Sequence, residues 1–197
     1  MALPEDPAQR HRVVAGAFTD LVLSADPRSW DASSPVAGWT ARDVVRHLTD
    51  WLPALLASSA GIDLTRGPSV DEDPAAAWTT QVSAVQALLD DPAAASRMLT
   101  NPHLGEAPVG ATIDRIYTSD VFMHRWDLGR ALGRDVELDA DTCAAMVEGM
   151  EQIDELLRSS GQYGPRVEVP EGSDPQTRLI GFIGRDPFWT APEAASA

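Results

Sequence analysis

The segment 114–133 constrains the fold most, because its apolar residues recur with the period of an amphipathic helix in DRIYTSDVFMHRWDLGRALG. The apolar positions of this stripe are Ile113, Ile116, Tyr117, Val121, Leu128 and Ala131. Gly133 follows the last of them, as glycine commonly does where a helix ends. The pattern predicts one long helix with a buried face, which has to pack against other elements.

Five further segments predict helices, separated by connections rich in turn residues. These predicted helices cover residues 7–25, 40–55, 74–89, 139–158 and 177–183. Thr40 and Asp43 match a capping box, in which a hydroxyl and a carboxylate three residues later satisfy backbone N–H groups at a helix start. The segment 100–110 contains two prolines and two glycines and predicts a loop, and no convincing strand pair is present.

These patterns together predict an all-α fold, an antiparallel four-helix bundle with additional short C-terminal elements. A chain of 197 residues that is 44% apolar can bury a sizeable core, so we expect a single domain over residues 1–197. Helix-borne functional groups would meet in the interior of such a bundle.

Composition excludes several classes of function. The net charge of −15 argues against nucleic-acid binding, because affinity for the phosphate backbone depends on cationic contacts. No window approaches the roughly 20 apolar residues that span a bilayer, and the N-terminal MALPEDPAQRHR lacks a secretory apolar core. The single cysteine forbids an internal disulfide, which agrees with a reducing, cytoplasmic setting. Together with the charge and the lack of a spanning segment, it leads us to expect a soluble cytoplasmic protein with no nucleic-acid or membrane partner.

A candidate metal site emerges from three polar residues on predicted inward faces. Asp120 and His124 are four residues apart and therefore lie one turn apart on the same helix face. His47 falls inside the apolar stripe of the second helix, between Val44 and Trp51. Two imidazoles and one carboxylate are ligands of zinc, and nickel, iron, manganese or cobalt suit the same set. The alternative is a pair of core histidines that hydrogen-bond to carboxylates or carbonyls.

Four other residues could take part in chemistry. His103 lies in the predicted loop, where a solvated histidine is the common case, but it could also face a substrate. Asp127 follows His124 by three residues and either stays near the site or serves packing and arginine pairing. Cys143 has no basic neighbour and is interpreted as a small buried apolar residue. His11, between two arginines, is predicted to face solvent.

Three runs of sequence resemble the DinB-like superfamily, and within it the mycothiol-dependent maleylpyruvate isomerase N-terminal, metal-binding family. The runs are WTARDVVRH at 39–47, DVFMHRWDL at 120–128 and GRDPFW at 184–189. The resemblance implies a DinB-like four-helix bundle that holds a divalent metal through His47, Asp120 and His124. The isomerase pattern has Glu where this chain has Asp120. Homodimers are also expected from this resemblance.

The resemblance further implies that mycothiol, a low-molecular-weight thiol, is a cosubstrate at the metal. We therefore expect a metal-dependent thiol S-transferase or isomerase that acts on a small electrophilic substrate, with zinc or nickel as the cofactor. Because the chain lacks the additional C-terminal domain of the isomerase, a substrate other than maleylpyruvate is expected. The alternative is a non-catalytic metal-binding stress or partner module that keeps the same site.

Overall fold

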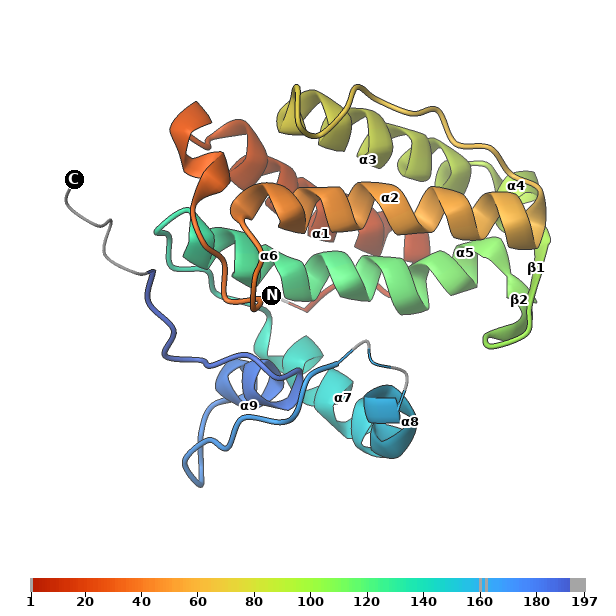
Figure 1. The fold of residues 1–197 in the computed structure, drawn as a ribbon. Coiled ribbons are helices and arrows are strands. Elements are labelled where there is room, and N and C mark those ends of the chain that lie inside the picture. Colours follow the sequence, from red (N-terminus) through yellow and green to blue (C-terminus); the bar gives the residue numbers. More distant parts are fainter. Residues whose placement is uncertain (1, 160, 162, 192–197) are drawn as a thin grey trace.

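The computed structural model describes residues 2–159, 161 and 163–191, and most of them are helical (Figure 1). The helices are α1 (Pro7–Leu23), α2 (Ala41–Ala60), α3 (Pro74–Asp90), α4 (Pro92–Ala95), α5 (Val109–Thr112), α6 (Ser119–Ala131), α7 (Ala140–Glu151), α8 (Asp154–Ser159) and α9 (Pro175–Phe182), with a 3-10 helix η1 (Pro27–Asp31) and a π-helix η2 (Ile113–Thr118). The strands are β1 (Met98–Asn101) and β2 (Gly105–Pro108). None of the helices in the described residues has both the length and the apolar character needed to cross a bilayer.

The helices α1, α2, α3 and α6 form a bundle, in which α1 and α2 each contact both α3 and α6 (Figure 1). His11 pairs with Gln86 and Thr19 with Trp78, so α1 and α3 run antiparallel. His47 of α2 pairs with Asp120 of α6, and Trp51 of α2 contacts Tyr117 of the π-helix that leads into α6, so α2 and α6 also run antiparallel. The connection 61–73 runs along the bundle, so α2 and α3 point in the same direction. The predicted all-α DinB-like fold is confirmed.

The bundle is held together by the apolar faces that the sequence predicts. Its largest side chains, each less than 2% exposed, include Phe18, Leu48, Leu52, Trp78, Tyr117 and Leu128. Burial of one such side chain stabilises the fold by about 1.5–3 kcal/mol. The positions of the functional groups on these helices are therefore fixed by core packing.

The starts of the helices are fixed by side-chain caps. Thr40 and Asp43 form the predicted capping box, with the Thr40 N–H donating to the Asp43 carboxylate over 2.9 Å. Asp6, Asp73 and Asp139 each accept a hydrogen bond from the backbone N–H three residues later. Each cap of this kind contributes about 1 kcal/mol, which explains why the predicted starts agree with the structure.

The segment 100–110 differs from the prediction, because it takes part in an antiparallel hairpin of β1 and β2. The expectation that no strands pair was therefore wrong. The Asn101 side chain accepts a hydrogen bond from the His103 N–H over 2.9 Å, and Gly105 adopts φ +76° to close the turn. Strands of four residues are too short for an alternating apolar pattern to reveal them.

The C-terminal elements α7, α8 and α9 lie together on the side of the bundle formed by α6 (Figure 1). The predicted helix 139–158 is interrupted, because the Ile153 N–H donates to the Met150 carbonyl in place of an α-helical bond. The Gln176 side chain of α9 accepts from the Leu138 N–H over 2.6 Å. The expectation of one domain over 1–197 stays a prediction, and residues 1, 160, 162 and 192–197 lie outside the described part.

Candidate metal centre

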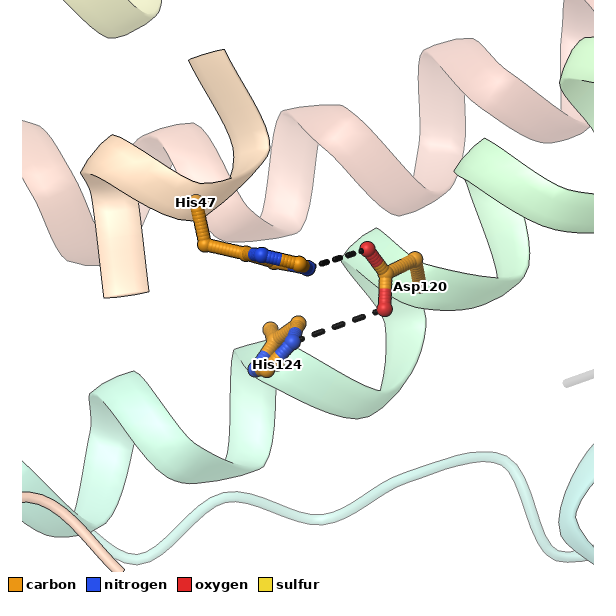
Figure 2. A group of neighbouring side chains, drawn as sticks. All are labelled: His47, Asp120 and His124. Carbon is orange, nitrogen blue, oxygen red and sulfur yellow. Dashed lines mark hydrogen bonds and ion pairs between the residues drawn. The ribbon is translucent and has the colours of Figure 1, made fainter. Parts of the chain in front are cut away.

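Three predicted ligand residues lie together between α2 and α6 (Figure 2). His47 Nε2 is 2.9 Å from Asp120 Oδ2, and His124 Nε2 is 3.4 Å from Asp120 Oδ1. One donor atom from each residue lies within 4.8 Å of the other two. The convergence expected from the two helix faces is thus observed, while the role of the three as metal ligands stays a prediction.

The helix turn before the site is a π-helix rather than the continuous α-helix that the sequence predicts. This turn, η2, ends at Thr118, two residues before Asp120. Its Tyr117 is fully buried and donates its hydroxyl to the Leu48 carbonyl over 3.0 Å, next to His47 on α2. The bond ties the two ligand-bearing helices together beside the site, and π-turns are frequent at functional sites.

The three side chains fit a divalent cation. Ligand atoms about 2.1 Å from a shared ion in tetrahedral geometry lie about 3.4 Å apart. His47 Nε2 lies 2.9 Å from Asp120 Oδ2 and His124 Nε2 lies 3.4 Å from Asp120 Oδ1, so each imidazole is near this distance from one of the two oxygens, and the three donor atoms lie within 4.8 Å of one another. Two imidazole nitrogens and one carboxylate oxygen are also the kind of donors that zinc and nickel accept. Three protein ligands leave a further coordination position for a small molecule.

The cluster pairs an ionised carboxylate with a histidine that holds its proton more firmly than a free imidazole does. Burial raises the pKa of the Asp120 carboxyl, but the positive charge of His124 and hydrogen bonds from His47 and Trp51 outweigh it, so that its pKa lies below the ordinary value. Burial lowers the pKa of His124, but Asp120 and a hydrogen bond to Asp127 outweigh it and raise its pKa. Asp120 is therefore ionised at neutral pH, and a metal would compete with a proton for His124.

A second carboxylate orients His124 from behind. Asp127 is fully buried, and its Oδ2 lies 2.8 Å from His124 Nδ1. Arg185, in the segment after α9, places its guanidinium 3.4 Å from the same carboxylate. Since Nδ1 is engaged by Asp127, Nε2 is the nitrogen left to face Asp120 and a metal. Asp127 therefore belongs to the site, and Arg185 is a site residue that the sequence analysis did not single out.

Two tryptophans enclose the histidines. The Trp39 ring lies 5.1 Å from the His47 ring and 5.8 Å from the His124 ring, and it stacks on the latter at 17°. The Trp51 Nε1–H donates to Asp120 Oδ2 over 3.1 Å. The His124 side chain is only 6% exposed whereas that of His47 is 33% exposed, so the site is reached past His47.

An open depression of about 520 Å³ lies on that side of the cluster, and its walls include Trp39, Arg46, His47 and Trp51.

A family model described as the mycothiol maleylpyruvate isomerase N-terminal domain matches residues 11–129. The chain belongs to this family. Comparisons with curated proteins and with solved structures found no match.

The family match includes all three candidate ligands and Asp127 but ends before Arg185. In this member of the mycothiol maleylpyruvate isomerase N-terminal family, the guanidinium that contacts Asp127 therefore comes from outside the matched domain. In the sequence, Arg185 belongs to the run 184–189, which resembles the family. The run alone does not show that Arg185 contacts Asp127, because this contact depends on how the C-terminal elements pack against the bundle.

Two of the other candidate residues stand apart from the cluster. His103 is exposed at the turn of the β1–β2 hairpin, where its backbone rather than its ring is engaged by Asn101. Cys143 is buried on α7, and burial raises the pKa of its thiol to about 12. A thiol with this pKa is not ionised at neutral pH, so Cys143 is not a nucleophile there.

The prediction that His11 faces solvent was wrong. Its side chain is fully buried, its Nδ1 lies 3.0 Å from Gln86 Oε1, and its ring stacks on Tyr117 at 6.1 Å. The signal was present, because His11 precedes Val14 and Phe18 by three and seven residues and so shares their helix face. The flanking arginines, which pair with acidic residues at the surface, concealed it.

Proposed function

We propose that the protein binds a divalent metal through His47, Asp120 and His124 and uses a low-molecular-weight thiol, mycothiol, to transform a small electrophile. The observation that carries the proposal is the convergence of three donor atoms within 4.8 Å beside an open depression. The description of the family names mycothiol, which supports this thiol as the cosubstrate. S-transfer and isomerisation are the two reaction classes that we propose.

Zinc is the proposed metal, and nickel suits the same donor set. A divalent cation supplies one kind of chemistry at such a site, because it lowers the pKa of a thiol or water that it binds. The protein contributes a fixed set of donors. Packing holds Asp120 and His124 on one face of α6, and Asp127 keeps the His124 ring in one orientation.

The surroundings of the cluster suit a reactive small molecule. Trp39 and Trp51 pack against the histidine rings and also form walls of the open depression beside His47. The depression beside His47 provides room for a thiol and an electrophile to approach together. The Asp120 side chain is only 18% exposed, and this burial strengthens its electrostatic interactions with bound groups.

The test is a conjugation assay with the purified, zinc-loaded protein and a generic electrophile. Mycothiol is compared with glutathione and bacillithiol, and the wild type with His124→Ala. We expect turnover with mycothiol that is lost in His124→Ala and retained in His103→Ala, a matched histidine variant on the exposed hairpin turn. Equal turnover in the wild type and His124→Ala would refute the proposal.

A protein that holds metal but turns over none of the three thiols would support the alternative of a non-catalytic metal-binding module. The assay therefore separates the metal site from the chemistry assigned to it. Product analysis by mass distinguishes the two reaction classes, since S-transfer joins the thiol to the electrophile, with loss of HX where a leaving group X is displaced, and isomerisation leaves the mass of the substrate unchanged.

A further inference from the structure

Trp51 reaches the candidate metal centre from α2, one helical turn after His47. Its indole Nε1–H donates to Asp120 Oδ2 over 3.1 Å, and its side chain also forms part of the wall of the depression. The hydrogen bond therefore joins the wall of the depression directly to a predicted metal ligand.

The Trp51 ring is held in place by neighbours from two elements. Its centroid lies 5.5 Å from that of Tyr117, edge to face at 65°, and 6.3 Å from that of His47. Tyr117 is fully buried and is itself fixed by its hydrogen bond to the Leu48 carbonyl. Packing on both sides sets the direction of the indole N–H, so the donor is already aimed at Asp120 in the folded chain.

The two oxygens of Asp120 have different partners (Figure 2). Oδ2 accepts from Trp51 and lies 2.9 Å from His47 Nε2, whereas Oδ1 lies 3.4 Å from His124 Nε2. A carboxylate only accepts hydrogen bonds, so His47 Nε2 acts as a donor in this contact. If that nitrogen bound a cation it could no longer donate, and Trp51 would be the donor that Oδ2 keeps among the contacts described.

The indole N–H is suited to such a supporting role. It is a donor without a lone pair to offer, so it cannot be a metal ligand itself and can act only through the carboxylate. Trp39 provides a comparison, because its ring lies 5.1 Å from that of His47 and lines the same depression. Within the described residues, Trp39 contacts the cluster by ring stacking and not by a hydrogen bond from its indole.

We infer that Trp51 is a positioning residue of the candidate metal centre. Its N–H fixes the orientation of the Asp120 carboxylate and keeps Oδ2 hydrogen-bonded, so that Oδ1 is the oxygen that holds the cation. The inference rests on the metal binding in the proposed function and assigns a role to a residue outside the three ligands. Coordination through one oxygen leaves the further position open for a small molecule.

The test is a titration of the metal-free protein with cobalt against a chelator of known affinity, followed by the visible spectrum. Trp51→Phe keeps an aromatic ring and removes the N–H. We expect about a tenfold weaker cobalt affinity, as for the loss of an outer hydrogen bond to a metal ligand. We also expect weaker visible absorption, because a carboxylate that is free to turn can bind through both oxygens, and cobalt absorbs less strongly as its number of ligands rises.

Trp39→Phe is the matched control, and it should bind cobalt with the affinity and spectrum of the wild type. Equal affinity and spectrum in Trp51→Phe and the wild type would overturn the role of Trp51 and leave the proposed metal site intact. A weaker affinity with an unchanged spectrum would also overturn it, since the carboxylate would not have turned. If the wild type binds no cobalt, the proposed function fails, and the inference fails with it.

A second measurement does not depend on how well the variant folds. In the isotope-labelled, zinc-loaded wild type, the Trp51 indole N–H signal can be assigned in nuclear magnetic resonance spectra through its proximity to the Tyr117 ring. The signal should exchange slowly with solvent, because the N–H stays hydrogen-bonded to Asp120 although the side chain lines an open depression. Exchange as fast as that of a free tryptophan would overturn the inference.

Discussion

His124 is engaged on both sides of its ring. Its Nε2 faces Asp120 at 3.4 Å, and its Nδ1 lies 2.8 Å from Asp127. A buried carboxylate on the distal nitrogen fixes the tautomer and raises the basicity of the other nitrogen. Because Asp127 has no exposed surface, its charge is supported only by His124 and the guanidinium of Arg185 among the contacts described.

Replacing Asp127 by Asn should weaken metal binding without removing a ligand. The amide carries no charge and can present its N–H₂ group to His124 Nδ1, which would disfavour the tautomer that leaves Nε2 free. The loss of a carboxylate that hydrogen-bonds to a metal-binding histidine lowers metal affinity by about 10- to 100-fold. Competition with a chelator of known affinity measures the change, with Asp63→Asn at an exposed loop position as the control. Equal affinities in Asp127→Asn and the wild type would contradict the role of Asp127.

The buried His11 should make stability depend on pH. Burial lowers its pKa below the ordinary value of 6.5, and the nearby Arg12 lowers it further, while Gln86 and Asp90 raise it. As the pH falls below about 6.5, the unfolded chain takes up a proton at His11 before the folded protein does, so the free energy of unfolding decreases.

The variant His11→Asn has no group that takes up a proton in this pH range, so it lacks this pH-dependent loss of stability. The side-chain N–H₂ of the asparagine can still donate a hydrogen bond to Gln86. We expect denaturant unfolding at a series of pH values below 6.5 to show a smaller loss of stability in His11→Asn than in the wild type. The exposed His103→Asn should follow the wild type. If the free energy of unfolding fell with pH to the same extent in His11→Asn and the wild type, protonation of His11 would not be the cause of the pH dependence.

At the level of residues, the sequence could predict the meeting of His47, Asp120 and His124, because each lies on the inner face of an amphipathic helix and two of them are one turn apart. It could not predict the pairing of Arg185 with Asp127. These residues are 58 positions apart, and their contact depends on the docking of irregular segments that carry no periodic signal.

The elements that carry the site were predictable where a local cap or stripe defines them. Thr40 begins α2 and Asp139 begins α7, because each side chain satisfies backbone N–H groups irrespective of the rest of the fold. The π-turn η2 and the β1–β2 hairpin were not predictable. The π-turn is tied to another element by the bond from Tyr117 to Leu48, and the strands of the hairpin are too short to show an alternating apolar pattern.

The end of α6 depends on a glycine that permits close packing. A Cβ at Gly129 would lie 2.1 Å from Val136 Cγ2 and 3.2 Å from its Cβ. Valine is stiff at χ1 and this one is buried, so the clash cannot be relieved by rotating an exposed side chain. The chain leaving the bundle toward α7 therefore packs against α6 at a residue that has no side chain.

Gly129→Ala should destabilise the protein by about 1–3 kcal/mol, as overpacking does. Gly149→Ala is the matched control, since this glycine lies on the exposed side of α7 with nothing within 4 Å of a Cβ. There alanine should stabilise the helix by about 0.5–1 kcal/mol. Chemical denaturation of both variants measures the difference, and a neutral or stabilising effect of Gly129→Ala would contradict the close packing.

At the scale of the molecule, the bundle and the C-terminal elements have different parts in the site. The bundle supplies the donor atoms from α2 and α6, and the C-terminal elements supply Arg185 behind them. Arg134 holds the junction by donating to the side chain and carbonyl of Ser24 over 2.7 Å and 2.8 Å. The four long helices of the bundle could be predicted from apolar periodicity, whereas these long-range contacts could not.

The most direct test of this account is the metal content of the protein purified without a nickel column and measured by elemental analysis. The account predicts one divalent ion per chain in the wild type, a near-complete loss in His124→Ala, and full retention in the exposed-turn variant His103→Ala. Full metal content in His124→Ala, or a wild type that takes up no divalent metal when supplied with zinc or nickel, would contradict it.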